Sequence, residues 1–182
     1  MKLADADILI LPGLGNSAPG HWQMRWAERM STAAIVEQAD WDEPDLDDWV
    51  STIDQACRLT TRPVVLVAHS LAVAAVAHAA PRLPDNVRGA FLVAPTDVEL
   101  SPAAPEEVFG FRPIPRDPFT FPSLLVASSN DPYVTLERAV EFANCWGSDF
   151  HQAGEAGHIN LDSGHGPWPE GLLMFTRLMQ RL

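Results

Sequence analysis

Short apolar runs alternate with amphipathic stretches along the whole chain. The runs at 8–13, 63–68 and 87–94 are apolar at nearly every position, which is typical of strands buried on both faces of a parallel sheet, whereas the run at 35–41 contains polar residues. The stretches between them repeat apolar residues every three to four positions, as Leu46, Trp49, Val50 and Ile53 do. We predict strands at 8–13, 35–41, 63–68, 87–94, 122–128 and 150–153, and helices at 21–30, 45–59, 71–80, 135–146 and 170–182.

This alternation predicts an α/β fold: a doubly wound, mostly parallel sheet of about six strands with helices on both faces. A length of 182 residues suits a single domain, here 1–182. The segment 95–121 contains six prolines, so we expect an irregular excursion over the sheet edge instead of a long helix.

The charge balance argues against several classes of partner. Acidic residues number 24 against 12 Lys and Arg, giving a net charge of −12, which repels nucleic acid and anionic membranes. No run approaches the ~20 apolar residues of a membrane helix, and two early acids break any signal peptide, so we expect a cytoplasmic protein. Cys57 and Cys145 lack any metal-ligand spacing, and we expect no metal and no cofactor.

Ser70 lies where an apolar strand, 63–68, meets a helix of small residues, 71–80. A sharp strand–turn–helix at this point would hold the hydroxyl out at the carboxyl edge of the sheet, as a nucleophile elbow does. The elbow pattern has glycine two residues before and after the serine, whereas this chain has Ala68 and Ala72. Alanine is the next smallest residue, so we expect the turn to form.

Two further residues follow Ser70 in the order typical of α/β-hydrolases, serine, then acid, then histidine. Asp131 lies three residues after the fifth predicted strand, and His158 follows the last strand. In such a triad the histidine accepts the serine proton and the carboxylate orients the imidazole. Asp97, after the fourth predicted strand, is an alternative acid, and His165 is an alternative base. We favour Asp131 because Asn130-Asp131-Pro132 is the sharper strand-end turn, and His158 because His165 lies farther past the last strand.

The same pattern suggests where an oxyanion and a substrate would bind. Backbone N–H groups of Leu71, directly after the serine, and Leu14, in the turn after the first strand, are the predicted oxyanion donors. Residues near these turns are candidates for the substrate pocket, although a core role for the tryptophans is equally open: His21, Trp22 and Trp168.

Several sequence blocks resemble the small serine hydrolases of the RBBP9/YdeN family, within the α/β-hydrolase superfamily. They are Leu-Pro-Gly with its following His-Trp, Val-Val-Leu-Val-Ala-His-Ser-Leu, the segment 121–133, and Gly-Glu-Ala-Gly-His-Ile-Asn at 154–160. The resemblance implies Ser70 as nucleophile, Asp131 as acid, His158 as base, six central strands and no large lid. Neither cysteine lies in a Leu-x-Cys-x-Glu segment, so the retinoblastoma-type partner associated with the vertebrate relative is not expected here.

Together these features predict a metal-independent serine hydrolase that cleaves a small carboxylic ester or amide through an acyl-enzyme intermediate. The alternative is a catalytically silent hydrolase fold that serves as a binding module, which Ala68 and Ala72 would favour if they distort the elbow. A nucleotide-binding domain is a weaker alternative, since Pro-Gly-Leu-Gly-Asn-Ser matches no complete phosphate-binding motif.

Overall fold

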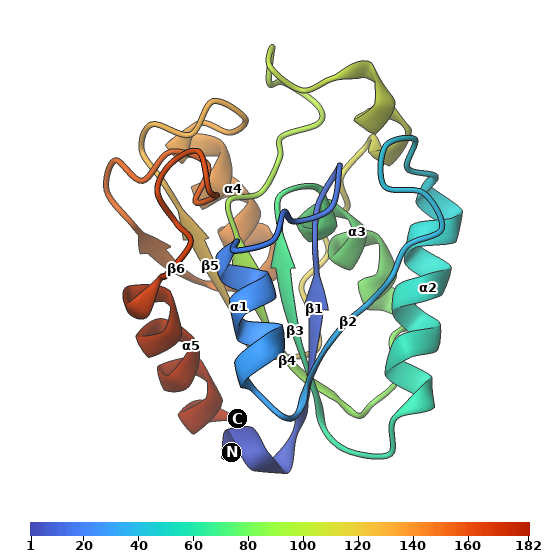
Figure 1. Ribbon diagram of the computed structural model, residues 1–182. Coiled ribbons are helices and arrows are strands. Elements are labelled where there is room, and N and C mark those ends of the chain that lie inside the picture. Colours follow the sequence, from blue (N-terminus) through green and yellow to red (C-terminus); the bar gives the residue numbers. More distant parts are fainter.

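The computed structural model describes residues 1–182 and contains one parallel sheet of six strands in the order β2-β1-β3-β4-β5-β6 (Figure 1). The predicted α/β class is therefore confirmed. The strands are β1 (Asp7–Leu11), β2 (Ala33–Ile35), β3 (Val64–His69), β4 (Val87–Val93), β5 (Ser123–Ala127) and β6 (Asp149–Gln152).

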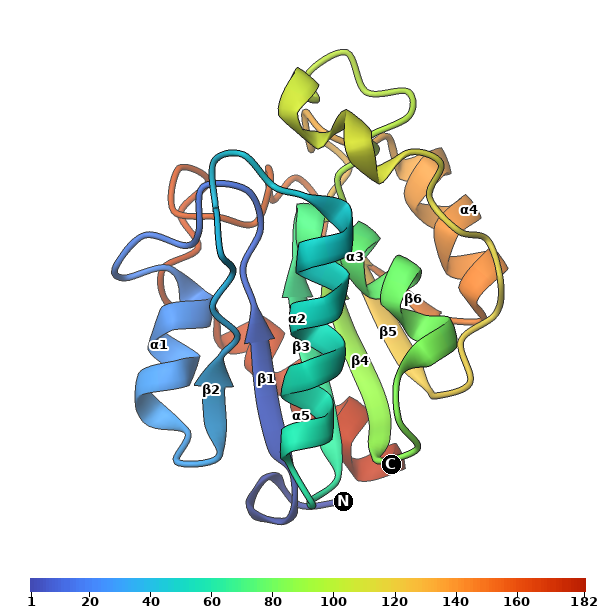
Figure 2. The same cartoon turned by 90° about the vertical axis from the view of Figure 1, so that its right-hand side faces the viewer.

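Five α-helices cover the two faces of the sheet: α1 (Trp22–Arg29), α2 (Leu46–Leu59), α3 (Leu71–Ala79), α4 (Leu136–Trp146) and α5 (Pro169–Arg181). Helices α1 and α5 lie on one face, and α2, α3 and α4 lie on the other (Figures 1 and 2). Two of the helices are capped by the side chain of the residue before them, which accepts a hydrogen bond from a backbone N–H of the first turn. Asp45 caps α2 and Thr135 caps α4 in this way.

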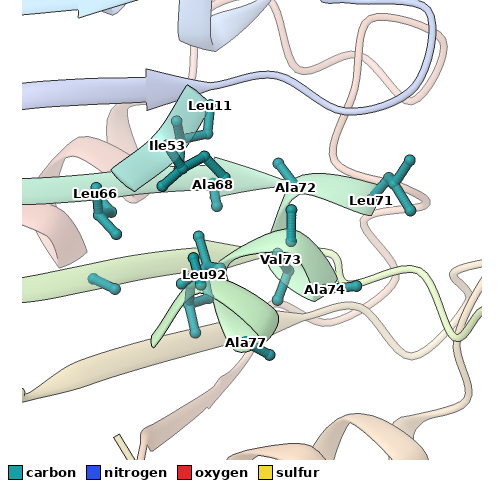
Figure 3. Close-up of a cluster of buried hydrophobic side chains, with 14 of the residues drawn as sticks. Leu11, Ile53, Leu66, Ala68, Leu71, Ala72, Val73, Ala74, Ala77 and Leu92 are labelled. Carbon is teal, nitrogen blue, oxygen red and sulfur yellow. The ribbon is translucent and has the colours of Figure 1, made fainter. Parts of the chain in front are cut away.

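Alternate strand residues enter two separate apolar clusters. Leu9 and Leu66 point into a cluster of 34 buried residues shared with α2, α3 and α4, whereas Ile8 and Val65 join 17 residues shared with α1 and α5. Helix α3 is buried along its length except at His78, and its small apolar side chains lie in the cluster drawn in Figure 3. Its small side chains let it pack closely on the sheet, which positions the turn that precedes it.

The predicted second strand is displaced in the structure. We expected 35–41, but β2 spans Ala33–Ile35 and pairs only with Ile8–Ile10 of β1. Beyond it the Asp40 carboxylate accepts the backbone N–H groups of Asp42 and Glu43. This local turn competes with strand pairing at the sheet edge, so the prediction from apolar spacing was wrong here.

Residues 95–121 form the expected irregular excursion, which stands above the carboxyl edge of the sheet (Figure 2). Its regular part is a 3-10 helix at Glu106–Phe111. The side chains of Val108 and Phe111 are buried in the core, so the segment packs against the molecule beside the strand ends. None of the helices is long and apolar enough to span a bilayer.

Candidate active site

The strand order reverses between β1 and β3, and the turns after these two strands meet at the carboxyl edge. Ser70 occupies the turn between β3 and α3 with φ 59° and ψ −125°, a strained backbone for a residue other than glycine. The backbone N–H of Ser70 donates to the Val93 carbonyl of β4 at 3.0 Å. This is the sharp turn that the sequence predicts, located at a topological switch point where α/β sheets bind ligands.

The two alanines of the elbow are compatible with this turn. Ala68 and Ala72 are both buried in the larger cluster, beside Leu71 and Val73 (Figure 3). The close approach is instead made by the turn after β1. A Cβ on Gly13 would lie 2.7 Å from the Ser70 Cβ and 3.0 Å from the His69 carbonyl oxygen, so glycine is required there.

This approach places the predicted oxyanion donors at one cavity. Leu71 is the first residue of α3, where backbone N–H groups lack partners within the helix. A Cβ on Gly13 would lie 3.2 Å from the Leu71 nitrogen, and Leu14 follows Gly13 directly. Leu14 and Leu71 both line the cavity that contains Ser70.

His158 and Asp131 lie beside Ser70 although they are 88 and 61 residues away, as the numbering gives. The His158 Nε2 atom is 2.8 Å from the Ser70 Oγ atom, and its Nδ1 atom is 2.9 and 3.0 Å from the two Asp131 carboxylate oxygens. The Asp131 side chain is fully buried, and His158 is 9% exposed. A carboxylate accepts hydrogen bonds, so His158 carries its proton on Nδ1 and presents a bare Nε2 to the serine.

Polar residues at the end of β5 tie the histidine loop to the aspartate loop. Asn130 accepts the Gly157 backbone N–H through Oδ1 at 2.7 Å, and Ser128 accepts the Ala156 N–H through Oγ at 2.9 Å. These bonds hold His158 opposite Asp131. Asn160, two residues after the histidine, bonds with Ser163 within its own loop.

The two alternative residues lie elsewhere. Asp97 forms a bidentate ion pair with Arg138 of α4, at 2.7 and 3.2 Å, and does not contact His158. His165 has its Nδ1 atom 3.2 Å from the Ser163 hydroxyl and packs against Trp168. The geometry therefore assembles Ser70, His158 and Asp131 and leaves both alternatives outside.

A cavity of about 340 Å³ opens above Ser70. His21 lines it, as expected, but Trp22 and Trp168 do not. The two tryptophans are 0% and 6% exposed and pack against each other in the smaller cluster, because the indole N–H of Trp22 bonds the Ile159 carbonyl and draws the ring inward. The open alternative, a core role for both tryptophans, is the one observed.

Comparisons with known proteins identify the family. A family model described as serine hydrolase matches residues 8–177. The chain belongs to the serine hydrolase family. A YdeN-like hydrolase from Pectobacterium atrosepticum shares 32% identity and superposes with a TM-score of 0.86, over 97% of this chain and 92% of that chain.

More distant structures share the fold. The ydeN gene product of B. subtilis has 19% identity and a TM-score of 0.80, over 96% of this chain and 99% of its own. Esterase 2 of Thermogutta terrifontis has 16% identity and a TM-score of 0.71, over 100% and 85%. A search of curated protein sequences found no match. The predicted YdeN-type resemblance and α/β-hydrolase fold are thus confirmed, and the protein is a hydrolase.

Two further imidazoles lie near His158 in this serine hydrolase. Burial, followed by the nearby charges of His158 and His165, lowers the pKa of His21 from 6.5 to about 4. Burial also lowers the pKa of His69 well below its usual value, and its Nε2–H donates to the His158 carbonyl at 2.9 Å. His21 accepts the Gln23 N–H through Nδ1, so its proton is on Nε2. Both rings are neutral donors near pH 7.

Sequence reasoning missed one polar contact of Ser70. The Thr96 hydroxyl, in the loop after β4, lies 2.9 Å from the Ser70 Oγ atom and is 5% exposed. Its position directly after the strand end was the available signal, because residues at the carboxyl edge of a parallel sheet face the site. In this loop the sequence pattern favours the neighbouring Asp97, because a carboxylate is a familiar triad member.

Proposed function

We propose that this hydrolase cleaves a small carboxylic ester or amide through an acyl-enzyme intermediate on Ser70. The observation that carries the proposal is the continuous contact from Asp131 through His158 to the Ser70 hydroxyl. A serine hydroxyl is a weak nucleophile and needs a base within hydrogen-bond reach, which His158 supplies at 2.8 Å.

In the first half of the reaction His158 Nε2 takes the Ser70 proton while the Ser70 oxygen bonds to the substrate carbonyl carbon. The carbonyl oxygen becomes an oxyanion, which the backbone N–H groups of Leu14 and Leu71 stabilise. His158 then gives the proton to the departing alcohol or amine. In the second half a water molecule repeats the sequence, and Ser70 leaves with its proton restored.

The cavity supports a small, uncharged substrate. Its volume is about 340 Å³, at the lower end of ligand pockets, and no lysine or arginine is among its 17 lining residues. His21 and His69 stay neutral, and the exposed Asp162 is the one carboxylate among the lining residues. An anionic substrate would lose its hydration without gaining a cationic partner.

A fluorophosphonate probe tests the proposal, because it forms a covalent adduct with an activated serine. We expect an adduct on Ser70 in the folded protein and none in Ser70→Ala, with a loss of kcat of about 10⁴–10⁶ toward p-nitrophenyl esters. Ser51→Ala, on the surface of α2, is the control that should label normally. Absence of an adduct in folded wild-type protein would favour the silent binding module instead.

The substrate class is then narrowed by two series of compounds. One series lengthens the acyl chain of p-nitrophenyl esters, and the other presents aminoacyl amides. We expect kcat/KM to fall once the acyl chain outgrows the cavity, and to fall on addition of a terminal carboxylate. A preference for carboxylate-bearing esters would contradict the proposed uncharged substrate.

A further inference from the structure

The Ser70 Oγ atom has two hydrogen-bond partners, and only one of them belongs to the proposed triad. His158 Nε2 lies at 2.8 Å and Thr96 Oγ1 at 2.9 Å. Thr96 is buried at 5% exposure and lines the same cavity. A hydroxyl this close to a reacting atom affects where that atom points.

The direction of the Thr96 bond follows from counting protons. Asp131 accepts from His158 Nδ1, so the neutral ring has a bare Nε2 that can only accept. Ser70 has a single hydroxyl proton, and His158 Nε2 takes it as a hydrogen bond. Ser70 can therefore only accept from Thr96, which makes Thr96 the donor.

The structure also holds Thr96 in place. The next residue, Asp97, is 2% exposed, its backbone N–H donates to the Tyr133 carbonyl at 3.0 Å, and its carboxylate pairs with Arg138. Threonine is also restricted at χ1 because it is β-branched. Its hydroxyl is consequently presented to Ser70 from a fixed loop.

We propose that Thr96 is a further catalytic residue, which orients the nucleophile by donating a hydrogen bond to the Ser70 oxygen; this rests on the proposed function. The bond occupies one Ser70 lone pair and keeps the Ser70 proton directed at His158. During attack the Ser70 O–H bond breaks, its proton moves to His158 Nε2, and the remaining Ser70 lone pair bonds to the carbonyl carbon. Thr96 keeps its own proton throughout and donates again when Ser70 departs.

Two variants separate the hydroxyl from the rest of the side chain. Thr96→Val has the same shape without the hydroxyl, and Thr96→Ser keeps the hydroxyl. We measure kcat, KM and the rate of phosphonylation by a fluorophosphonate, which needs no deacylation step. For Thr96→Val we expect kcat and the phosphonylation rate to fall about tenfold with KM nearly unchanged, and Thr96→Ser should recover most of both.

A matched control removes one hydroxyl from another pair of bonded hydroxyl groups, far from the cavity. Ser123 Oγ lies 2.6 Å from Ser148 Oγ at the opposite end of β5, so Ser123→Ala should lower Tm without changing the phosphonylation rate. Unchanged rates in Thr96→Val, or equal losses in Thr96→Val and Thr96→Ser, would overturn the role of Thr96. If wild-type protein forms no adduct on Ser70, the proposed function fails and the role of Thr96 fails with it.

Discussion

The loops after β4 and β5 each place a buried aspartate at the carboxyl edge of the sheet, but the two carboxylates bind different kinds of side chain. Asp131 after β5 faces the imidazole of His158 at 2.9 Å. Asp97 after β4 faces the guanidinium of Arg138 at 2.7 Å. The two loops are joined by a hydrogen bond from the Asp97 N–H to the Tyr133 carbonyl, so the two aspartates differ in partner although their loops are neighbours.

A carboxylate at a strand end thus acquires its role from the side chain that it contacts. A neutral imidazole can exchange a proton with the serine beyond it, whereas a guanidinium keeps its proton at all ordinary pH values. We therefore regard Asp131 as the acid of the proposed triad, and Asp97 as the anchor that holds Thr96 against Ser70.

The largest effect should come from removing the charge of Asp131. In Asp131→Asn the amide would favour the wrong tautomer of His158, and we expect kcat to fall by about 10⁴ with little change in Tm. Steady-state kinetics on a p-nitrophenyl ester, with circular dichroism to verify folding, measures this. A loss of less than tenfold would mean that Asp131 and Asp97 do not differ in the way proposed.

Removal of the other aspartate should mainly affect stability. Asp97→Ala leaves the Arg138 guanidinium, 15% exposed, without its bidentate partner, and we expect the free energy of unfolding to fall by about 2–3 kcal/mol. Urea unfolding gives this value. The phosphonylation rate should fall by no more than about tenfold, since Thr96 loses its anchor but His158 and Asp131 stay in place. A kcat loss like that of Asp131→Asn at unchanged stability would reverse the two assignments.

The smallest expected effect is on stability and concerns Glu99, which forms ion pairs with Arg138 and Arg116. Burial alone would raise the pKa of Glu99, but hydrogen bonds from Arg116, the Ile114 N–H and Arg138 lower it from 4.5 to about 2. The folded state thus keeps this carboxylate charged where the unfolded chain is protonated. Its contribution to stability is complete above pH 4.5 and is lost as the pH falls toward 2.

Replacing the carboxylate tests this dependence. Glu99→Gln should lower the free energy of unfolding by about 1–2 kcal/mol at pH 7, and the difference from wild type should shrink between pH 4.5 and pH 2. Urea titrations at several pH values measure the difference. A constant difference across this range would show that the Glu99 charge does not stabilise the loop after β4.

Much of the fold followed from local patterns. The apolar run before Ser70 and the small-residue helix after it predicted a strand–turn–helix, because few other structures bury so continuous an apolar stretch. The predicted position of the edge strand β2 was wrong because its three residues pair on one side only, and the turn at Asp40 outweighs this weak pairing. Trp22 was ambiguous, because an aromatic ring beside a turn can enter either a core or a pocket.

The succession of strands and helices, the turn at Ser70, and the order of Ser70, Asp131 and His158 along the chain can be predicted from the linear sequence, since each depends on near neighbours. The tertiary structure sets which carboxylate meets the imidazole, the contact of Thr96 with the Ser70 oxygen, and the approach of Gly13 to the elbow. These contacts join residues that are 26 to 88 positions apart in the sequence. Their distances depend on sheet order and loop anchoring, which no local pattern encodes.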